Sequence, residues 1–133
     1  MRPEKTTAAH VSGNLAELVC SNSLKSEKLD TGAGLLKAEL RIHGSLLLDI
    51  AEQTKVPAGA ALAVDREEFG KLATERIESH PNITLERALM TDIPDSGYVI
   101  LACGPLAHST ISEKIKKLTG GALHFVDAIS PVI

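Results

Sequence analysis

A single cysteine stands where an apolar stretch of this sequence gives way to polar residues. Cys20 ends the segment NLAELVC, residues 14–20, and hydroxyl and amide side chains follow it directly in Ser21, Asn22 and Ser23. A thiol at this position is either a small core residue at the end of a helix or a reactive group held in a loop. Spacing alone leaves both alternatives open.

The residues around Cys20 bear on how readily its thiol could ionise. We predict a short helix over 14–20, because Asn14 can cap its first turn. A cysteine at the C-terminal end of that helix would meet the negative end of the helix dipole, which disfavours a thiolate. Lys25 and Lys28 follow closely and could offset this effect if the chain after Cys20 folds back.

Cys103, the second cysteine, lies too far from Cys20 in the sequence to suggest a disulfide framework or a CxxC site. Two isolated cysteines are typical of reduced thiols in a cytoplasmic protein. Because Cys103 ends an apolar run, we expect it to be a small buried residue. The five histidines are scattered and no pair has the i, i+4 spacing of a helical metal site, so we predict no bound metal.

Two glycine-containing segments could in principle bind a nucleotide. DTGAGLLK, residues 30–37, contains Gly-x-Gly, but no strand precedes it and Lys37 occupies the place of the third glycine of a dinucleotide fingerprint. We therefore interpret these glycines as packing residues at the start of a helix. YVILACGP, residues 98–105, ends an apolar run in small residues, which lets a ligand approach the backbone. A tight turn from strand to helix would explain it equally well.

Composition indicates a globular domain, or part of one, with an aliphatic core. The 133 residues are 44% hydrophobic and 23% charged but only 2% aromatic, so the core must consist of Leu, Ile, Val and Ala. The net charge of −3 indicates no basic face of the kind that free-standing nucleic-acid-binding proteins carry. No apolar run approaches the roughly 18 residues of a membrane span, and the N-terminus does not resemble a signal peptide.

Hydrophobic spacing and turn residues predict the elements that must position these groups. We expect a loop over 21–31, a long helix over 32–54 capped by Thr31, and another helix over 66–79 capped by Asp65. The 32–54 helix carries an apolar stripe that includes Leu36, Leu40, Leu47 and Ile50. It would contain Gly44 at a cost of about 1 kcal/mol relative to alanine, and His43 within the stripe is interpreted as a core histidine.

The second half of the chain is predicted to alternate strands and a helix. Strands are expected over 82–89, 98–103 and 122–128, and a helix over 109–119 that is closed by Gly120. The continuous apolar run over 98–103 is typical of a parallel strand buried on both faces. Strands that alternate with helices indicate an α/β layered fold.

Seven segments taken together resemble a known enzyme family. MRP, AELVCSNSLKS, GLLKAEL, VPAGAALAVDREEF, HPNITL, ILACGPL and LTGGALHFVDAISPVI occur in this order over nearly the whole chain. They are similar to the folate- and FAD-dependent tRNA (uracil-5-)-methyltransferases, which are related to the glucose-inhibited-division flavoproteins. The resemblance implies that residues 1–133 form part of a Rossmann-like, glutathione-reductase-like FAD-binding α/β domain, with no separate second domain in this chain.

The resemblance also implies an activity. The family methylates C5 of the T-loop uridine in tRNA, takes the carbon from methylenetetrahydrofolate, and uses FAD that NAD(P)H reduces. Its first βα phosphate-binding unit would lie upstream of Met1, so we expect an internal fragment that is inactive alone. The alternatives are a flavin-dependent oxidoreductase of the same fold with no RNA substrate, and an inactive remnant. The oligomeric state is left open.

Site residues follow from the same resemblance. Cys20 matches the family's cysteine near the flavin, which acts on the uracil either as nucleophile or as acid and base, together with a second cysteine beyond this chain. Asn22 and Ser23 would lie near the flavin or the folate, and Arg2 would lie by the adenosine ribose. In the family, the backbone at the end of one strand lies close to FAD, and the matching residues here are Ala102, Cys103, Gly104 and Pro105.

Overall fold

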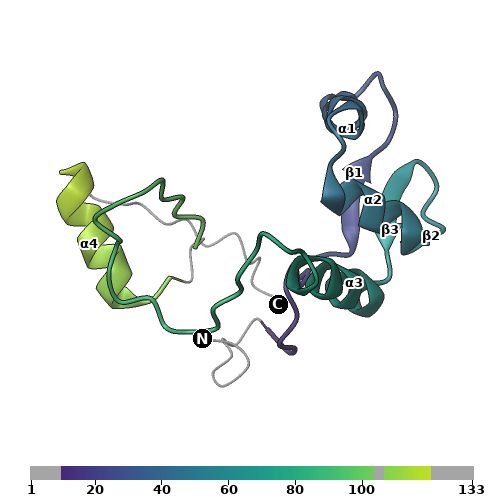
Figure 1. Cartoon of the computed structure of the whole chain (residues 1–133). Helices are drawn as coiled ribbons and strands as arrows, with labels where there is room; N and C mark the ends of the chain where they lie inside the picture. Colours follow the sequence, from purple (N-terminus) through teal and green to yellow (C-terminus); the bar gives the residue numbers. More distant parts are fainter. Residues whose placement is uncertain (1–9, 104–106, 121–133) are drawn as a thin grey trace, which may run out of the picture. The chain divides into compact units, whose positions relative to one another are not determined.

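The computed structural model describes residues 10–103 and 107–120, which fall into two units (Figure 1). The first unit ends at Glu86 and the second begins at Arg87. Among the described residues, the first holds a three-stranded sheet and three helices, and the second holds one helix. The predicted mixed α/β class is therefore confirmed, while the strand predicted over 122–128 lies outside the described residues.

The sheet has the strand order β1-β3-β2, and both pairings are antiparallel. Its strands are β1 (Ser23–Ser26), β2 (Lys55–Val56) and β3 (Ala61–Val64). The prediction of a loop over 21–31 is therefore wrong over 23–26, while the residues on either side form neither helix nor strand. β1 has the polar sequence SLKS, so no alternation of apolar residues marked it as a strand. Its pairing with the buried strand β3 makes it one.

β1 contains a bulge. Ser23 pairs with Ala63 and Ser26 pairs with Ala61, so β1 has one residue more than β3 over the same stretch. Lys25 accommodates the extra residue in the left-handed region, with φ of 70°. The Lys25 backbone N–H donates to Ser23 Oγ at 3.2 Å, and the Lys25 side chain is exposed.

The single helix predicted over 32–54 is two helices, α1 (Gly32–Ile42) and α2 (Leu46–Gln53). Gly44 separates them because its left-handed φ of 69° ends α1. The Gly44 N–H donates to the Arg41 carbonyl and the Ser45 N–H to the Leu40 carbonyl, both at 3.0 Å, which is the Schellman arrangement at a helix end. His43, expected in the core, is instead the exposed C-cap of α1.

The predicted cap of the third helix is confirmed. α3 (Arg66–Glu78) begins after Asp65, whose Oδ1 accepts from the N–H groups of Glu67 and Glu68, both at 3.0 Å. These bonds satisfy donors that the helix itself leaves unpaired. The acidic first turn also suits the positive end of the helix dipole.

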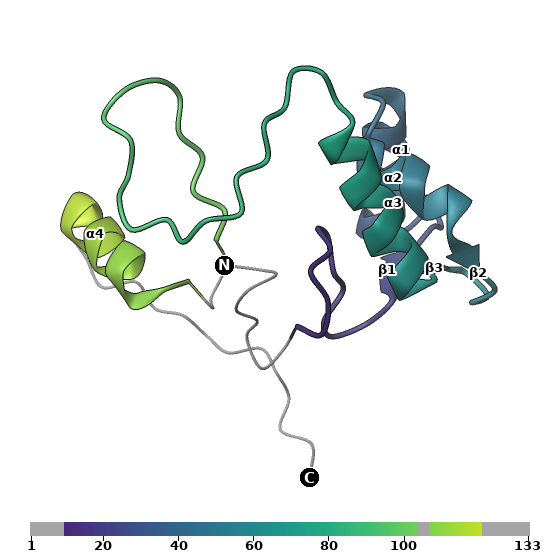
Figure 2. The same ribbon diagram turned by 60° about the horizontal axis from the view of Figure 1, so that its bottom comes forward.

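The core of the first unit lies where α2 and α3 cover β3, and α2 contacts α1 on its other side (Figures 1 and 2). Its buried side chains are Leu48, Ile50, Ala51, Leu62, Val64, Phe69 and Ala73. β3 contributes three consecutive buried residues, because it is the central strand. Of the apolar stripe predicted over 32–54, Ile50 is buried, whereas Leu36 and Leu40 are exposed.

α1 packs on β1 and the following residues through a glycine and a lysine. A Cβ on Gly34 would lie 1.9 Å from the carbonyl oxygen of Lys28, so only glycine permits this approach. Lys37 is 6% exposed, and its Nζ donates to the carbonyls of Ser26 and Ala33, both at 3.0 Å. Gly34 therefore serves packing, as predicted, whereas a Cβ on Gly32 would meet nothing within 4 Å.

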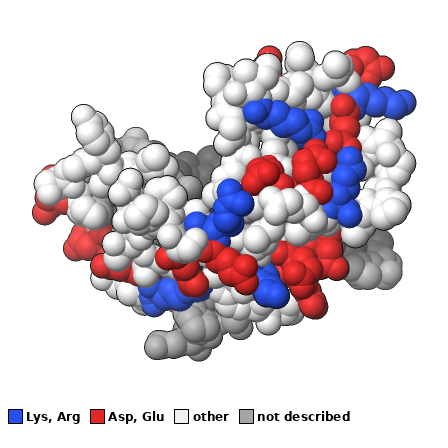
Figure 3. Space-filling view, turned by 45° about the vertical axis from the view of Figure 1, so that its right-hand side comes forward, with Lys and Arg blue, Asp and Glu red and all other residues white. Residues whose placement is uncertain are grey.

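An ion-pair network joins the chain after β1 to both α1 and β2. Glu27 binds Lys55 and Arg41, and Arg41 also binds Glu52. The hydrogen bond from Lys55, with a further bond from Arg41, lowers the pKa of the Glu27 carboxyl, while its partial burial opposes this shift. On the face shown in Figure 3, basic and acidic side chains stand next to one another in the same way.

The second unit departs most from the sequence prediction. α4 (Ser109–Thr119) ends at Gly120, whose φ is 63°, so this helix and its cap are confirmed. In the part of the chain that the structure describes, neither 82–89 nor 98–103 forms a strand, and Ile100 is 90% exposed rather than buried. Both predictions are wrong because a strand gains its hydrogen bonds from a partner, and no strand of the described residues pairs with these segments.

Replacing Gly34 with alanine tests the packing of α1. We expect Gly34→Ala to lower the free energy of unfolding by at least about 2 kcal/mol, because its Cβ would displace the backbone at Lys28. Gly32→Ala is the matched control, because a Cβ there meets nothing within 4 Å. It should leave stability unchanged or raise it by up to about 1 kcal/mol. Urea unfolding measures both, and equal effects would contradict the packing described.

Candidate functional site

Cys20 lies in a segment of turns that leads into β1. The helix predicted over 14–20 is absent from the described structure; these residues form turns and bends, and Ala16 has a left-handed φ of 53°. The expected effect of a helix dipole on Cys20 therefore falls away, because no helix ends there. The Cys20 thiol is exposed, which decides against a core cysteine and favours a residue accessible for chemistry.

Helix α3 holds this segment in place. The Leu15 N–H donates to Thr74 Oγ1 at 2.8 Å, and Arg66 Nε donates to the Leu18 carbonyl at 2.9 Å. Gly70 eases the close approach, because a Cβ there would lie 3.3 Å from Asn14 Cβ and 3.4 Å from the Leu15 carbonyl oxygen. The position of the backbone just before Cys20 thus depends on three residues of α3.

The Glu17 carboxylate stabilises the N-terminal part of the turn segment that precedes Cys20. Glu17 accepts from the backbone N–H of Val11 at 2.8 Å and from the N–H and hydroxyl of Ser12 at 3.3 and 3.0 Å. Partial burial alone would raise the pKa of Glu17, but these hydrogen bonds outweigh it and the pKa is lowered. The ionised carboxylate therefore stabilises the turns on which Cys20 depends.

Asn22 and Ser23 fix the chain directly after Cys20. Asn22 Nδ2 donates to the Val64 carbonyl at 3.1 Å, and the Val64 N–H donates back to the Asn22 carbonyl at 3.0 Å. The Ser23 N–H donates to Ser21 Oγ at 3.0 Å. Three of the predicted site residues therefore lie close together in the chain, with Cys20 and Asn22 just before β1 and Ser23 as its first residue.

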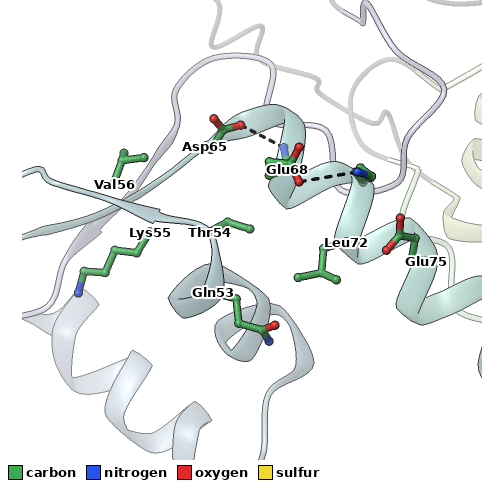
Figure 4. A pocket seen from close by; sticks show the side chains of 9 residues that line it. Gln53, Thr54, Lys55, Val56, Asp65, Glu68, Leu72 and Glu75 are labelled. Carbon is green, nitrogen blue, oxygen red and sulfur yellow. Dashed lines mark hydrogen bonds and ion pairs between the residues drawn. The ribbon is translucent and has the colours of Figure 1, made fainter.

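Several cavities of the described first unit border α3. One, of about 770 Å³, lies between α3 and the turn segment, and Cys20 directly follows its lining residue Val19. Its lining is Val11, Ser12, Asn14, Glu17, Leu18, Val19, Arg66, Glu67, Glu68, Gly70 and Lys71. A second, of about 420 Å³, lies beside β2 (Figure 4). Asp65 lines this second cavity, but its carboxylate already caps α3 (Figure 4). No predicted site residue lines the second cavity.

Ala102 and Cys103 belong to the second unit and line a cavity of about 270 Å³ there, together with Met90, His108 and Ile111 among others. Cys103 is exposed, so the expectation of a small buried residue is wrong. Its segment is not an internal strand in the described structure, which is why the cysteine is accessible.

Three predicted site residues, Arg2, Gly104 and Pro105, lie outside the described residues. Sequence reasoning missed Arg66 and Thr74, because a side chain that binds a distant backbone atom leaves no periodic signal. Within 10–103 and 107–120, no three His, Cys, Asp or Glu side chains gather into a possible metal site. No helix in those ranges has the length and apolar character needed to cross a membrane.

Comparison with known proteins supplies the context for this geometry. The family model described as glucose inhibited division protein A matches residues 5–133. Similar proteins include the methylenetetrahydrofolate–tRNA-(uracil-5-)-methyltransferases TrmFO of Aquifex aeolicus, 55% identical over 134 residues, and of Natranaerobius thermophilus, 54% identical. That of Geobacter sulfurreducens is 50% identical over 133 residues. Each match covers 100% of this chain and 30–31% of the relative, so the chain spans about 30% of their length.

Alkylation tests the exposure of Cys20. In a Cys103→Ser variant, we expect iodoacetamide to modify Cys20 in the folded chain within about tenfold of its rate in urea, because no burial protects the thiol. Peptide mass spectrometry at successive times measures both rates. Protection by more than about a hundredfold would contradict the exposed position and restore the core interpretation.

Proposed function

Because the chain belongs to the glucose inhibited division protein A family, we propose that it is part of a flavoenzyme that methylates C5 of the T-loop uridine in tRNA. The observation that carries the proposal is identity of 50–55% over the whole chain to proteins named for this reaction. Methylenetetrahydrofolate would supply the carbon, and FAD with NAD(P)H would supply the electrons. The enzyme would act in the cytoplasm.

Cys20 is the residue to which we assign the chemistry on the uracil. C5 of uracil is a poor nucleophile until a thiolate adds at C6, and the C5 proton must leave after the carbon has been transferred. A thiol whose ionisation is tuned can perform either task. The exposed thiol on a turn held by Arg66 and Glu17 suits a substrate that arrives from solvent.

Asn22 and Ser23 would contact the flavin or the folate. Asn22 Nδ2 is bound to Val64, but within the described residues its Oδ1 accepts no hydrogen bond. Ser23 Oγ accepts from the Lys25 N–H and still has a proton to donate. Each side chain therefore has one bond that fixes it and one group left for a ligand.

The cavity at Ala102 and Cys103 gives a test of fit for FAD. FAD supplies electron transfer when bound. The cavity walls include small residues such as Ala88, Ala102 and Ala107, which allow close approach of a flat group. Its 270 Å³ lies below the roughly 300–1,000 Å³ typical of complete ligand pockets. These residues, with Gly104 and Pro105, would therefore hold only part of the cofactor.

The fold assignment in finer detail is also a proposal. We place the chain in a Rossmann-like FAD-binding domain whose first βα phosphate-binding unit is not among these residues. Arg2 would then lie by the adenosine ribose. Support comes from the family match over 5–133.

A substitution of Cys20 in the full-length enzyme tests this function. We expect Cys20→Ala to lower the rate of 5-methyluridine formation at least about a hundredfold, while reduction of the flavin by NAD(P)H continues. Glu39→Ala, which changes an exposed side chain of α1, is the control and should retain most of the activity. Methylation is measured with unmodified tRNA and methylenetetrahydrofolate.

The same assay separates the alternatives. Normal methylation by Cys20→Ala would refute the role of this thiol. Flavin reduction without any methylation by the wild-type enzyme would instead favour the oxidoreductase that has no RNA substrate.

A further inference from the structure

The basic side chains of the first unit differ sharply in whether they are neutralised. Arg41 and Lys55 belong to the network with Glu27 and Glu52, while Arg76 pairs with Asp49 and Lys71 with Glu68. Each of these four basic side chains therefore has a carboxylate partner. Arg66 and Lys37 instead donate to backbone carbonyls.

Lys25 and Lys28 differ from these basic side chains. Within the described residues of this unit, the side chains of Lys25 and Lys28 make no ion pair and no hydrogen bond, and both are exposed. Both follow Cys20 closely in the chain. Among the described residues of the unit, Lys25 and Lys28 are therefore the basic side chains without a partner in the protein, although the chain as a whole has a net charge of −3.

The backbone that carries these lysines is fixed by serine side chains. The Lys25 N–H donates to Ser23 Oγ at 3.2 Å, and the Lys28 N–H donates to Ser26 Oγ at 3.1 Å. The bulge keeps Lys25 at a left-handed φ of 70°, a backbone conformation that is unfavourable for residues other than glycine. The fold therefore sets where the backbone of these two lysines lies.

Reach limits what the lysines can contact. A chain extends at most about 3.5 Å per residue, so the Cα atoms of Lys25 and Lys28 lie within about 18 Å and about 28 Å of the Cα of Cys20. An anion held by Lys25 or Lys28 would thus lie within a few nucleotides of a base at the thiol. Exposed ammonium groups without a carboxylate partner suit phosphate, since they displace counterions from it when they bind.

We infer that Lys25 and Lys28 contact backbone phosphates of the tRNA whose uridine is presented to Cys20. This inference rests on the proposed function and adds to it the residues that hold the polynucleotide. The phosphate contacts would position the strand without reading its sequence. The lysines are positioning residues and take no part in the bond changes.

The salt dependence of tRNA binding by the full-length enzyme tests the inference. We expect Lys25→Gln and Lys28→Gln each to reduce the slope of log K against log [salt] by about 1, because each removes one phosphate contact. Lys25→Arg keeps the charge and should restore the slope. Lys71→Gln, which removes an exposed lysine already paired with Glu68 at 4.0 Å, is the matched control and should leave the slope unchanged.

The outcomes are separable. Binding and methylation by the wild type with unchanged slopes for both glutamine variants would overturn the inference and leave the proposed function intact. An altered pH profile of Cys20 alkylation without any change in slope would also overturn it, because the lysines would then act on the thiol. Failure of the wild type to bind tRNA would refute the proposed function itself.

Discussion

The pairing of β1 with β3 is the constraint on which the candidate site depends. β3 is central and buried, so its position is fixed by the core of the first unit. β1 is polar and has no such anchor of its own; the ladder to β3 and the two bonds between Asn22 and Val64 hold it. The core thereby determines the position of β1. With β1 it determines where Cys20, which precedes the strand, and Lys25, which lies in its bulge, are placed.

Local signals in the sequence predicted what local chemistry determines. The caps at Thr31 and Asp65 and the stop at Gly120 depend on neighbouring atoms, and all three are present. Gly44 carried the same kind of signal, but its place inside a long apolar pattern concealed a helix end. A glycine with a polar neighbour on each side of it fits a C-terminal turn better than a helix interior.

Elements that depend on distant partners could not be predicted in this way. β1 became a strand through β3, although its own sequence reads as loop, whereas 98–103 has the composition of a strand and has no partner among the described residues. The same reason hid Arg66 and Thr74, which hold the turn before Cys20 across more than forty residues of sequence. The spacing of residues did not decide between a structural and a reactive Cys20, and the resemblance suggested its role. The structure then showed that Cys20 is exposed.

The central claim is that the exposed Cys20 thiol faces the tRNA substrate. The most direct measurement is the rate at which iodoacetamide alkylates Cys20 in the full-length enzyme, with and without saturating tRNA. A bound tRNA should cover the thiol and slow alkylation at least about tenfold, while Cys103 serves as an internal reference. An unchanged rate at Cys20, at a tRNA concentration where binding is demonstrated, would contradict this account.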